Sequence, residues 1–327
     1  MLIKTINAIL TVLAGVGAAL VLYWVLNKLV ELLPGKWEDR VKPYFYIAPA
    51  FAAIALYLIY PAIQTVVYSF ANADSTAWVG LKNYSALLGS HSFRQTLFNT
   101  VLWIVVVPAA TIILGLAIAV LADRLKPGSE KLAKTTIFLP MAISAVGAGT
   151  IWRFIYATNP PNEPQLGLQN AIVTGLGHDP VNWLQLNTLH FNSFELMVIL
   201  LWAQVGFAMV LLSAAIKGVP TETLEAARID GASELQIFGR VIVPQIWGTV
   251  ITVFITVTIG VMKIFDIVYV MTNGNFNTNV VGVEFFNQLF TNFNNGYAAA
   301  IVVMLMLAVL PIMIYQVRHF RADEAVR

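Results

Sequence analysis

The side chains that could carry out covalent chemistry are few and lie far apart along the chain. The 327 residues include no cysteine, so neither a disulfide nor a thiolate metal site can form. Lys134 and Thr135 have no glycine-rich segment before them, so they do not complete a phosphate-binding loop. The four histidines lack the spacing of a zinc hydrolase; they are His91, His178, His190 and His319. The sequence therefore predicts no catalytic residue, no metal site and no cofactor bound by this chain.

Polar and aromatic candidates lie instead within long apolar segments. An unsatisfied hydroxyl is costly in apolar surroundings, so such side chains are suited to hydrogen-bond or stack against a polar solute. One segment contains Trp202, Gln204 and Phe207, and another contains Thr256, Thr258 and Gly260. The competing interpretations are that Gln204 forms a hydrogen bond between helices and that Trp202 only packs.

The composition indicates what these segments are. Hydrophobic residues make up 58% of the chain and charged residues 11%, against about 25% charged residues in soluble domains. About 20 helical residues, rising about 1.5 Å each, cross a hydrocarbon core about 30 Å thick. Segments of this kind predict membrane helices at 6–26, 44–68, 98–121, 135–157, 194–216, 248–272 and 297–316. The predicted fold class is an all-α, polytopic transmembrane bundle, with a six-helix core and one additional N-terminal helix.

The distribution of Lys and Arg predicts the orientation, because these residues stay on the cytoplasmic side of a membrane. The loops between the predicted spans form two alternating sets, one on each side of the membrane. The cation-rich set carries Lys28, Lys36, Arg40, Lys42, Arg124, Lys126, Lys131, Lys134, Lys217, Arg228, Arg240, Arg318, Arg321 and Arg327. The opposite set carries only Lys4, Lys82 and Arg94. We expect a bacterial cytoplasmic membrane, a cytoplasmic C-terminus and an ordered outer loop at 158–193 that could dock a partner.

These spans define three regions. Residues 1–43 form an N-terminal transmembrane helix and a cytoplasmic linker, residues 44–317 form the transmembrane domain, and residues 318–327 form a cytoplasmic tail. The first apolar run also resembles a signal peptide. We predict a retained helix, because the run continues to Leu26 before the cations begin.

Three ionisable residues fall within the predicted spans. Lys263 and Asp266 are three residues apart, so a continuous helix would bring them together on one face. We predict an intrahelical ion pair, and the alternative is a role lining a solute path or gate. Arg153 lies near a span end and is expected to extend toward the membrane surface.

The cytoplasmic segment 218–247 has the pattern of helix, turn and helix. Pro220 and Thr221 can begin the first helix, and Gly231 after Asp230 suits the left-handed residue that ends it. Ser233 and Gln236 predict a capping box for the second helix. That helix presents Leu235, Phe238 and Val241 on one side, and Pro244 is expected to end it.

Within this segment, Glu225-Ala226-Ala227, Gly231 and Pro244 resemble the EAA loop of ABC importer permeases. Segments 80–84, 138–144, 265–274 and 296–300 look like those of carbohydrate-uptake permeases. Among these permeases the chain looks like the maltose-type first subunit. Segments 140–144 and 229–232 resemble those of its alpha-glucoside branch.

The resemblance implies partners and residue roles. It implies a second, homologous permease subunit, two cytoplasmic ATPase subunits that bind ATP and Mg, and an extracytoplasmic solute-binding protein, but no nucleic acid. The residues expected to contact the ATPase are Glu225, Ala226, Ala227, Asp230, Gly231, Phe238 and Pro244. The residues expected along the solute path are Trp202, Gln204, Phe207, Val257, Gly260, Val261, Lys263 and Asp266.

The predicted cargo is an alpha-glucoside or related osmolyte such as trehalose, sucrose, maltose or glucosylglycerol. Two positions at which maltose-type proteins carry asparagine fall on Leu200 and Val261, which counts against maltose itself. An importer for another solute, such as glycerol phosphate, is the first alternative, although Lys263 is opposed by Asp266. An ion-coupled carrier or a membrane enzyme would leave the loop from Glu225 to Pro244 unexplained.

Overall fold

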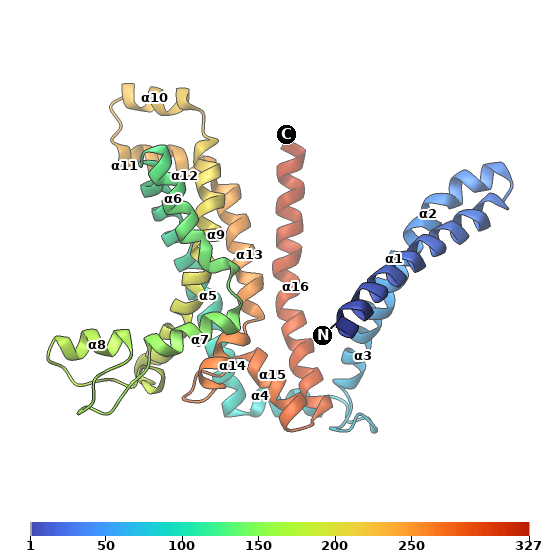
Figure 1. The fold of residues 1–327 in the computed structure, drawn as a ribbon, viewed down its shortest axis with the longest axis horizontal. Helices are drawn as coiled ribbons and strands as arrows, with labels where there is room; N and C mark the ends of the chain where they lie inside the picture. The colour runs from blue at the N-terminus through green and yellow to red at the C-terminus, as the bar shows by residue number, and fades with distance from the viewer. Residues whose placement is uncertain (1, 327) are drawn as a thin grey trace. The chain divides into compact units, whose positions relative to one another are not determined.

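The computed structural model describes residues 2–326, most of which are helical (Figure 1). Among these residues the only β pairing is an isolated bridge between Ala71 and Trp78, so the predicted all-α fold class is confirmed. The chain divides into two compact units, which meet in sequence at Val67 and Tyr68. Arg327 lies outside the described residues, as do the side chains of His319 and Arg321.

The first unit is a pair of long apolar helices. Helix α1 covers Leu2–Glu31, and α2 (Gly35–Ile54) continues through a π-helical turn at Ala55–Ile59 into α3 (Tyr60–Tyr68). The rings of Tyr23 and Tyr46 stack with centroids 6.0 Å apart, and Tyr46 Oη donates to Asn27 Oδ1 at 2.8 Å. Both helices are long and apolar enough to cross a membrane, as predicted for 6–26 and 44–68.

The second unit holds the remaining helices. Three of them are long and apolar enough to span a membrane: α5 (His91–Asp123), α9 (Phe191–Lys217) and α16 (Asn295–Val326). The helices at the start of this unit are α4 (Lys82–Gly89), α5 (His91–Asp123), α6 (Pro127–Phe138), α7 (Ala145–Ile155) and α8 (Leu168–Gly175). The central helices are α9 (Phe191–Lys217), α10 (Thr221–Ile229), α11 (Glu234–Ile237) and α12 (Val243–Gln245). The last are α13 (Trp247–Met262), α14 (Asp266–Thr272), α15 (Val281–Phe286) and α16 (Asn295–Val326).

The core of this unit forms where α5 packs against both α9 and α13. Trp103, Leu196 and Met209 are fully buried there. Small residues permit the close approach: a Cβ added at Gly115 would lie 2.7 Å from Ala208 Cβ, and one at Gly206 would overlap the Ile137 carbonyl oxygen. Close packing at small residues is how helices associate where no hydrophobic effect drives them together.

The predicted span 135–157 is not one straight helix. Helix α6 and a 3₁₀ turn at Leu139–Ala142 meet α7 at an angle of 105°. Pro140 cannot donate a backbone hydrogen bond, and Ser144 starts α7 by accepting from Gly147 N at 3.1 Å. At the end of α7, Arg153 donates to the Val270 carbonyl oxygen of α14, so this side chain ties two helices together.

The predicted span 248–272 is interrupted. Helix α13 ends at Met262 and α14 begins at Asp266, while Phe265 between them has φ −142° and ψ −60°. The predicted ion pair between Lys263 and Asp266 is therefore wrong, because the two residues no longer share one helical face. Both side chains are exposed, and the ion pairs found among residues 2–326 do not include them.

The loop at 158–193 is built around a buried asparagine. Asn170 is fully buried, its Oδ1 accepts from Val181 N and Trp183 Nε1 at 2.9 Å, and its Nδ2 donates to the Val181 carbonyl at 3.0 Å. In Figure 1, α8 of this loop lies at the opposite end of the unit from α10. The predicted order of this loop thus has a physical cause, since one amide satisfies several backbone groups.

Candidate functional site

The loop between α9 and α13 contains the predicted helix, turn and helix. Helix α10 begins directly after Pro220, and α11 begins after Ser233. Gly231 joins them with φ +82°, a left-handed conformation that glycine adopts without a steric cost. The predicted capping box is present: Ser233 N donates to Gln236 Oε1 at 2.8 Å, and Gln236 N donates to Ser233 Oγ at 3.4 Å.

An exposed ion pair links the two helices across this turn. Arg228 Nε donates to Glu234 Oε1 at 2.9 Å, which links the last turn of α10 to the start of α11. The hydrogen bond from Arg228 lowers the pKa of Glu234 below its ordinary value. Because both side chains are exposed, this pair orients the two helices more than it stabilises them.

The prediction that Pro244 ends the second helix is wrong. A π-helical turn at Phe238–Ile242 follows α11 and leads into α12, which contains Pro244 and runs to Gln245. A π turn re-routes the backbone hydrogen bonds, so the missing amide proton of Pro244 need not break the helix. The chain changes direction only at Ile246, where the two helical segments differ by 70°.

The predicted ATPase-contacting residues divide by exposure. Glu225, Ala226, Asp230, Gly231 and Pro244 are exposed, whereas Ala227 and Phe238 are partly buried. The side chains of Ile229 and Leu235 are 87% and 85% exposed, although both are large and apolar. An apolar pair displayed on two short helices is the surface that a docking partner would cover. The sequence pattern named Leu235 on the apolar side but did not single out Ile229.

A second candidate site is a pocket of about 280 Å³ between α9 and α13. Five of the predicted path residues line it together: Gln204, Phe207, Val257, Gly260 and Val261. Met141, Leu200, Thr256 and Ile264 complete the lining, so the pocket has no charged residue. Leu200 and Val261, which the sequence resemblance predicts to stand where maltose-type proteins carry asparagine, both line this pocket.

Gln204 is the main polar group of this pocket. Among the described residues its side-chain amide has no hydrogen-bond partner, so the predicted alternative of an interhelical bond is not observed. The hydroxyl of Thr256 donates to the Thr252 carbonyl oxygen at 2.8 Å and keeps lone pairs free to accept. The pocket therefore offers an amide donor and acceptor, a hydroxyl acceptor and the ring of Phe207.

Three predicted path residues lie elsewhere. The ring of Trp202 packs edge-on against Trp152, with centroids 5.9 Å apart, as expected for a packing role. Lys263 lines a different pocket of about 300 Å³ together with Phe265, Gly282 and Phe286. Asp266 is exposed at the start of α14. The interrupted segment 263–265 separates the two pockets, because Ile264 lines the first and its two neighbours line the second.

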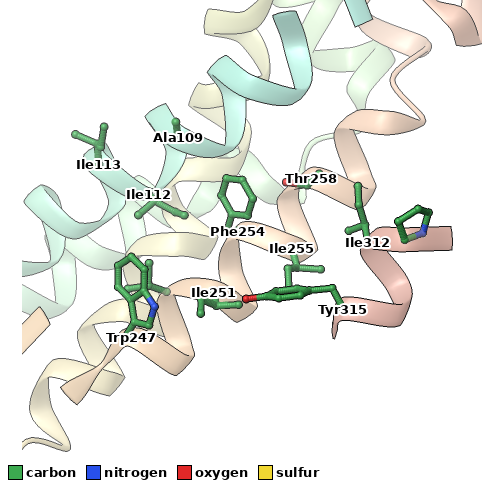
Figure 2. Close-up of a pocket in the computed structure, with 12 residues that line it drawn as sticks. Ala109, Ile112, Ile113, Trp247, Ile251, Phe254, Ile255, Thr258, Ile312 and Tyr315 are labelled. Carbon is green, nitrogen blue, oxygen red and sulfur yellow. The ribbon is translucent and has the colours of Figure 1, made fainter. Parts of the chain in front are cut away.

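A larger pocket of about 680 Å³ lies between α5, α13 and α16 (Figure 2). It is lined mainly by aliphatic and aromatic side chains, among them Ile112, Ile251, Phe254 and Ile312. Thr258 adds one hydroxyl, which has no partner among the described residues. This apolar lining suits a hydrocarbon chain better than a polar solute, because most hydroxyl groups of a polar solute would find no hydrogen-bond partner there.

Comparison with known proteins agrees with this arrangement. Residues 87–322 match the family described as binding-protein-dependent transport system inner membrane component. The chain is 45% identical to the alpha-glucoside transport system permease protein AglF of Rhizobium meliloti, over 97% of each protein. It is also 45% identical to the osmoprotective compounds uptake permease protein GgtC of Synechocystis, over 86% of this chain and all of that protein.

The fold is shared with a solved transporter. A chain of a bacterial ABC transporter that imports the acidic polysaccharide alginate superposes with a TM-score of 0.75 and 19% identity, covering 88% of this chain and 99% of that one. The family match and the identity to named permeases show a helical membrane permease, a transport subunit rather than an enzyme. The chain belongs to the family of inner membrane components of binding-protein-dependent transport systems, the permease subunits of ABC importers.

Proposed function

We propose that this permease carries an alpha-glucoside or a related neutral osmolyte through the pocket between α9 and α13. The observation that carries the proposal is the uncharged lining with an unpartnered Gln204 amide. A sugar offers hydroxyl groups to that amide and an apolar ring face to Phe207. The names of its relatives, an alpha-glucoside permease and an osmoprotective compound permease, support the same chemical class.

Glycerol phosphate is a weaker candidate. A relative from Agrobacterium fabrum named as an sn-glycerol-3-phosphate permease is 29% identical over 86% of this chain. A phosphate would be expected to meet cations, and the pocket between α9 and α13 contains none. The uncharged pocket therefore favours a neutral cargo.

The assembly proposed around this chain has a second permease subunit, two cytoplasmic ATPase subunits that bind ATP and Mg, and an extracytoplasmic binding protein. Loop 218–247 would dock into an ATPase subunit through α10 and α11, and the exposed Ile229 and Leu235 support this role. The C-terminus would then be cytoplasmic, on the side of this loop.

The cargo can be tested by ATP hydrolysis of the complete assembly in lipid, with its binding protein present. The solutes are trehalose, sucrose, maltose, glucosylglycerol and glycerol phosphate. We expect stimulation by one or more of the neutral glucosides and none by the phosphate. Stimulation by glycerol phosphate alone would keep the transport class and overturn the proposed cargo.

The docking role of the loop has a separate test. Gly231→Leu places a side chain at φ +82°, which costs about 1–2 kcal/mol in the local backbone and distorts the turn. We expect loss of solute-stimulated ATP hydrolysis with normal membrane insertion, and the same from Glu225→Lys. Gly128→Leu, in open space on α6, is the control. Unchanged stimulation in Gly231→Leu would refute the assignment of the loop.

A further inference from the structure

Four charged side chains meet where α5, α6 and α9 come together, next to the start of loop 218–247. They are Asp123, Glu130, Lys134 and Lys217, called here the ion cluster. Lys134 Nζ lies 2.5 Å from Asp123 Oδ1 and 2.6 Å from Glu130 Oε1. Lys217 pairs with Glu130, and its Nζ is 3.8 Å from Asp123 Oδ1. Two anions thus balance two cations across three helices.

The ion cluster holds the last turn of α9 in particular. Ser213, which is 3% exposed, accepts a hydrogen bond from Lys134 Nζ at 2.5 Å and donates to Asp123 Oδ1 at 2.8 Å. Ser213 and Lys217 lie one turn apart on one face of α9, and Asp123 of α5 is a partner of both. The side chains of Asp123, Glu130 and Lys134 are only 15–19% exposed, so these bonds are screened less than those of a surface pair.

The connection from the last turn of α9 to loop 218–247 is short and conformationally restricted. Only Gly218, Val219 and Pro220 separate α9 from α10. Val219 is 7% exposed and packs in the main core, and Pro220 has a fixed φ of −58°. The other end of the loop is different, since it reaches α13 through a π turn and the 70° bend at Ile246.

We propose that the ion cluster is the point at which movement of loop 218–247 enters the bundle. It makes the ends of α5, α6 and α9 move with α10 as one body, while the bend at Ile246 lets α13 turn separately. Its members are positioning residues, because they touch neither the solute pocket nor the proposed docking surface. The inference rests on the proposed docking role of the loop. It adds the site at which movement of the loop is passed to the transmembrane helices.

The test compares variants in the complete assembly. Lys217→Met removes the pairs of Lys217 with Glu130 and Asp123, and Glu130→Gln removes the pairs of Glu130 with Lys217 and Lys134. Lys217→Arg keeps the charge. Lys131→Met is the matched control, because Lys131 is an exposed cation on the same helix as Glu130, without an ion pair among residues 2–326. Two quantities are measured: amide hydrogen exchange at Gly218 and Val219 without solute, and solute-stimulated relative to basal ATP hydrolysis.

We expect Lys217→Met and Glu130→Gln to speed exchange at Gly218 and Val219 about tenfold, since a locally opened helix end loses protection. Stimulation should fall at least about fivefold while basal hydrolysis remains, the range of a typical coupling between sites. The double variant should lose less than the sum of the two single losses, because both single variants remove the shared pair between Lys217 and Glu130. Lys217→Arg should keep wild-type stimulation.

Unchanged exchange and stimulation in both variants would overturn the proposal, as would an equal loss in Lys131→Met. A fall in thermal stability with full stimulation would also overturn it, because the ion cluster would then only stabilise the fold. Failure of the proposed cargo is distinguishable: the wild-type assembly would show no stimulation by any glucoside, while the exchange measurement would still report on the ion cluster.

Discussion

Gln204 is exceptional within its helix because it keeps an unsatisfied amide in a membrane span. The neighbouring residues of α9 pack against α5 and α6 through apolar contacts, and Val205, Gly206 and Ala208 are buried. A free amide in such a helix is costly unless water or a ligand completes its hydrogen bonds. The absence of charge around it narrows the suitable ligands to neutral polar molecules.

The first prediction concerns this amide. Gln204→Leu should reduce the apparent affinity for the transported solute about tenfold, as expected for loss of one hydrogen bond contributing about 1.4 kcal/mol. Concentration-dependent uptake in proteoliposomes measures the change. Thr252→Val is the control, because its hydroxyl bonds to the Gly248 carbonyl oxygen at 2.9 Å and does not line the pocket. Equal uptake in wild type and Gln204→Leu would exclude a solute contact.

The second prediction follows from the break between Lys263 and Asp266. Because the two residues lie at the ends of different helices without an ion pair, Lys263→Met and Asp266→Asn should affect stability independently. Their effects on the free energy of unfolding should add within about 0.5 kcal/mol. A thermal or denaturant double-mutant cycle in detergent measures this sum, and a coupling well above that value would show that the two charges interact.

At the scale of elements, glycines decide how close the helices come. Gly206 lets α9 lie against the backbone of α6 at Ile137 and Phe138, where the 3₁₀ turn that precedes the 105° bend begins. Gly282 has the same role at the interrupted span, where an added Cβ would lie 2.5 Å from the Ile264 carbonyl oxygen. Both irregular spans therefore occur where another helix reaches their backbone.

The third prediction uses this contact. Gly206→Ala should lower the free energy of unfolding by about 1–3 kcal/mol, because α9 and α6 must separate to admit the methyl group. Gly239→Ala is the matched control: it makes the same substitution in a helical turn, with no atom near the added methyl. Thermal unfolding in detergent should separate the two variants. If both behave alike, the close approach of α9 and α6 has no energetic consequence.

For the whole molecule, hydropathy predicted which segments are helical and membrane-spanning. Local capping chemistry predicted the turn at Gly231 and the box at Ser233. Neither could predict the bend between Ala142 and Ala145 or the break after Met262, because apolar residues continue on both sides of each, and the backbone contacts with Gly206 and Gly282 near these places join segments far apart in the sequence. The grouping of Gln204 with Gly260 came from resemblance to known permeases, whereas the predicted ion pair between Lys263 and Asp266 failed because a continuous helix was assumed.

The fourth prediction concerns orientation and exploits the absence of cysteine from the chain. Leu176→Cys, in the loop 158–193, and Lys126→Cys, between α5 and α6, introduce exposed thiols at opposite ends of the second unit. A membrane-impermeant maleimide should label Leu176→Cys in right-side-out vesicles and Lys126→Cys only in inside-out vesicles. The reverse pattern would invert the proposed orientation and place loop 218–247 outside the cytoplasm.

The first unit has a consequence for biosynthesis. None of the residues in the most apolar windows of α1 and of the α2–α3 helix is buried, and the stacked tyrosines Tyr23 and Tyr46 join the two helices directly. The helices of this hairpin make their backbone hydrogen bonds internally, and the hairpin does not need to pack against the rest of the protein. It can therefore leave the ribosome-bound insertion channel as soon as residue 68 has emerged. We therefore expect the nascent chain to anchor itself by this hairpin while most of the permease is still untranslated.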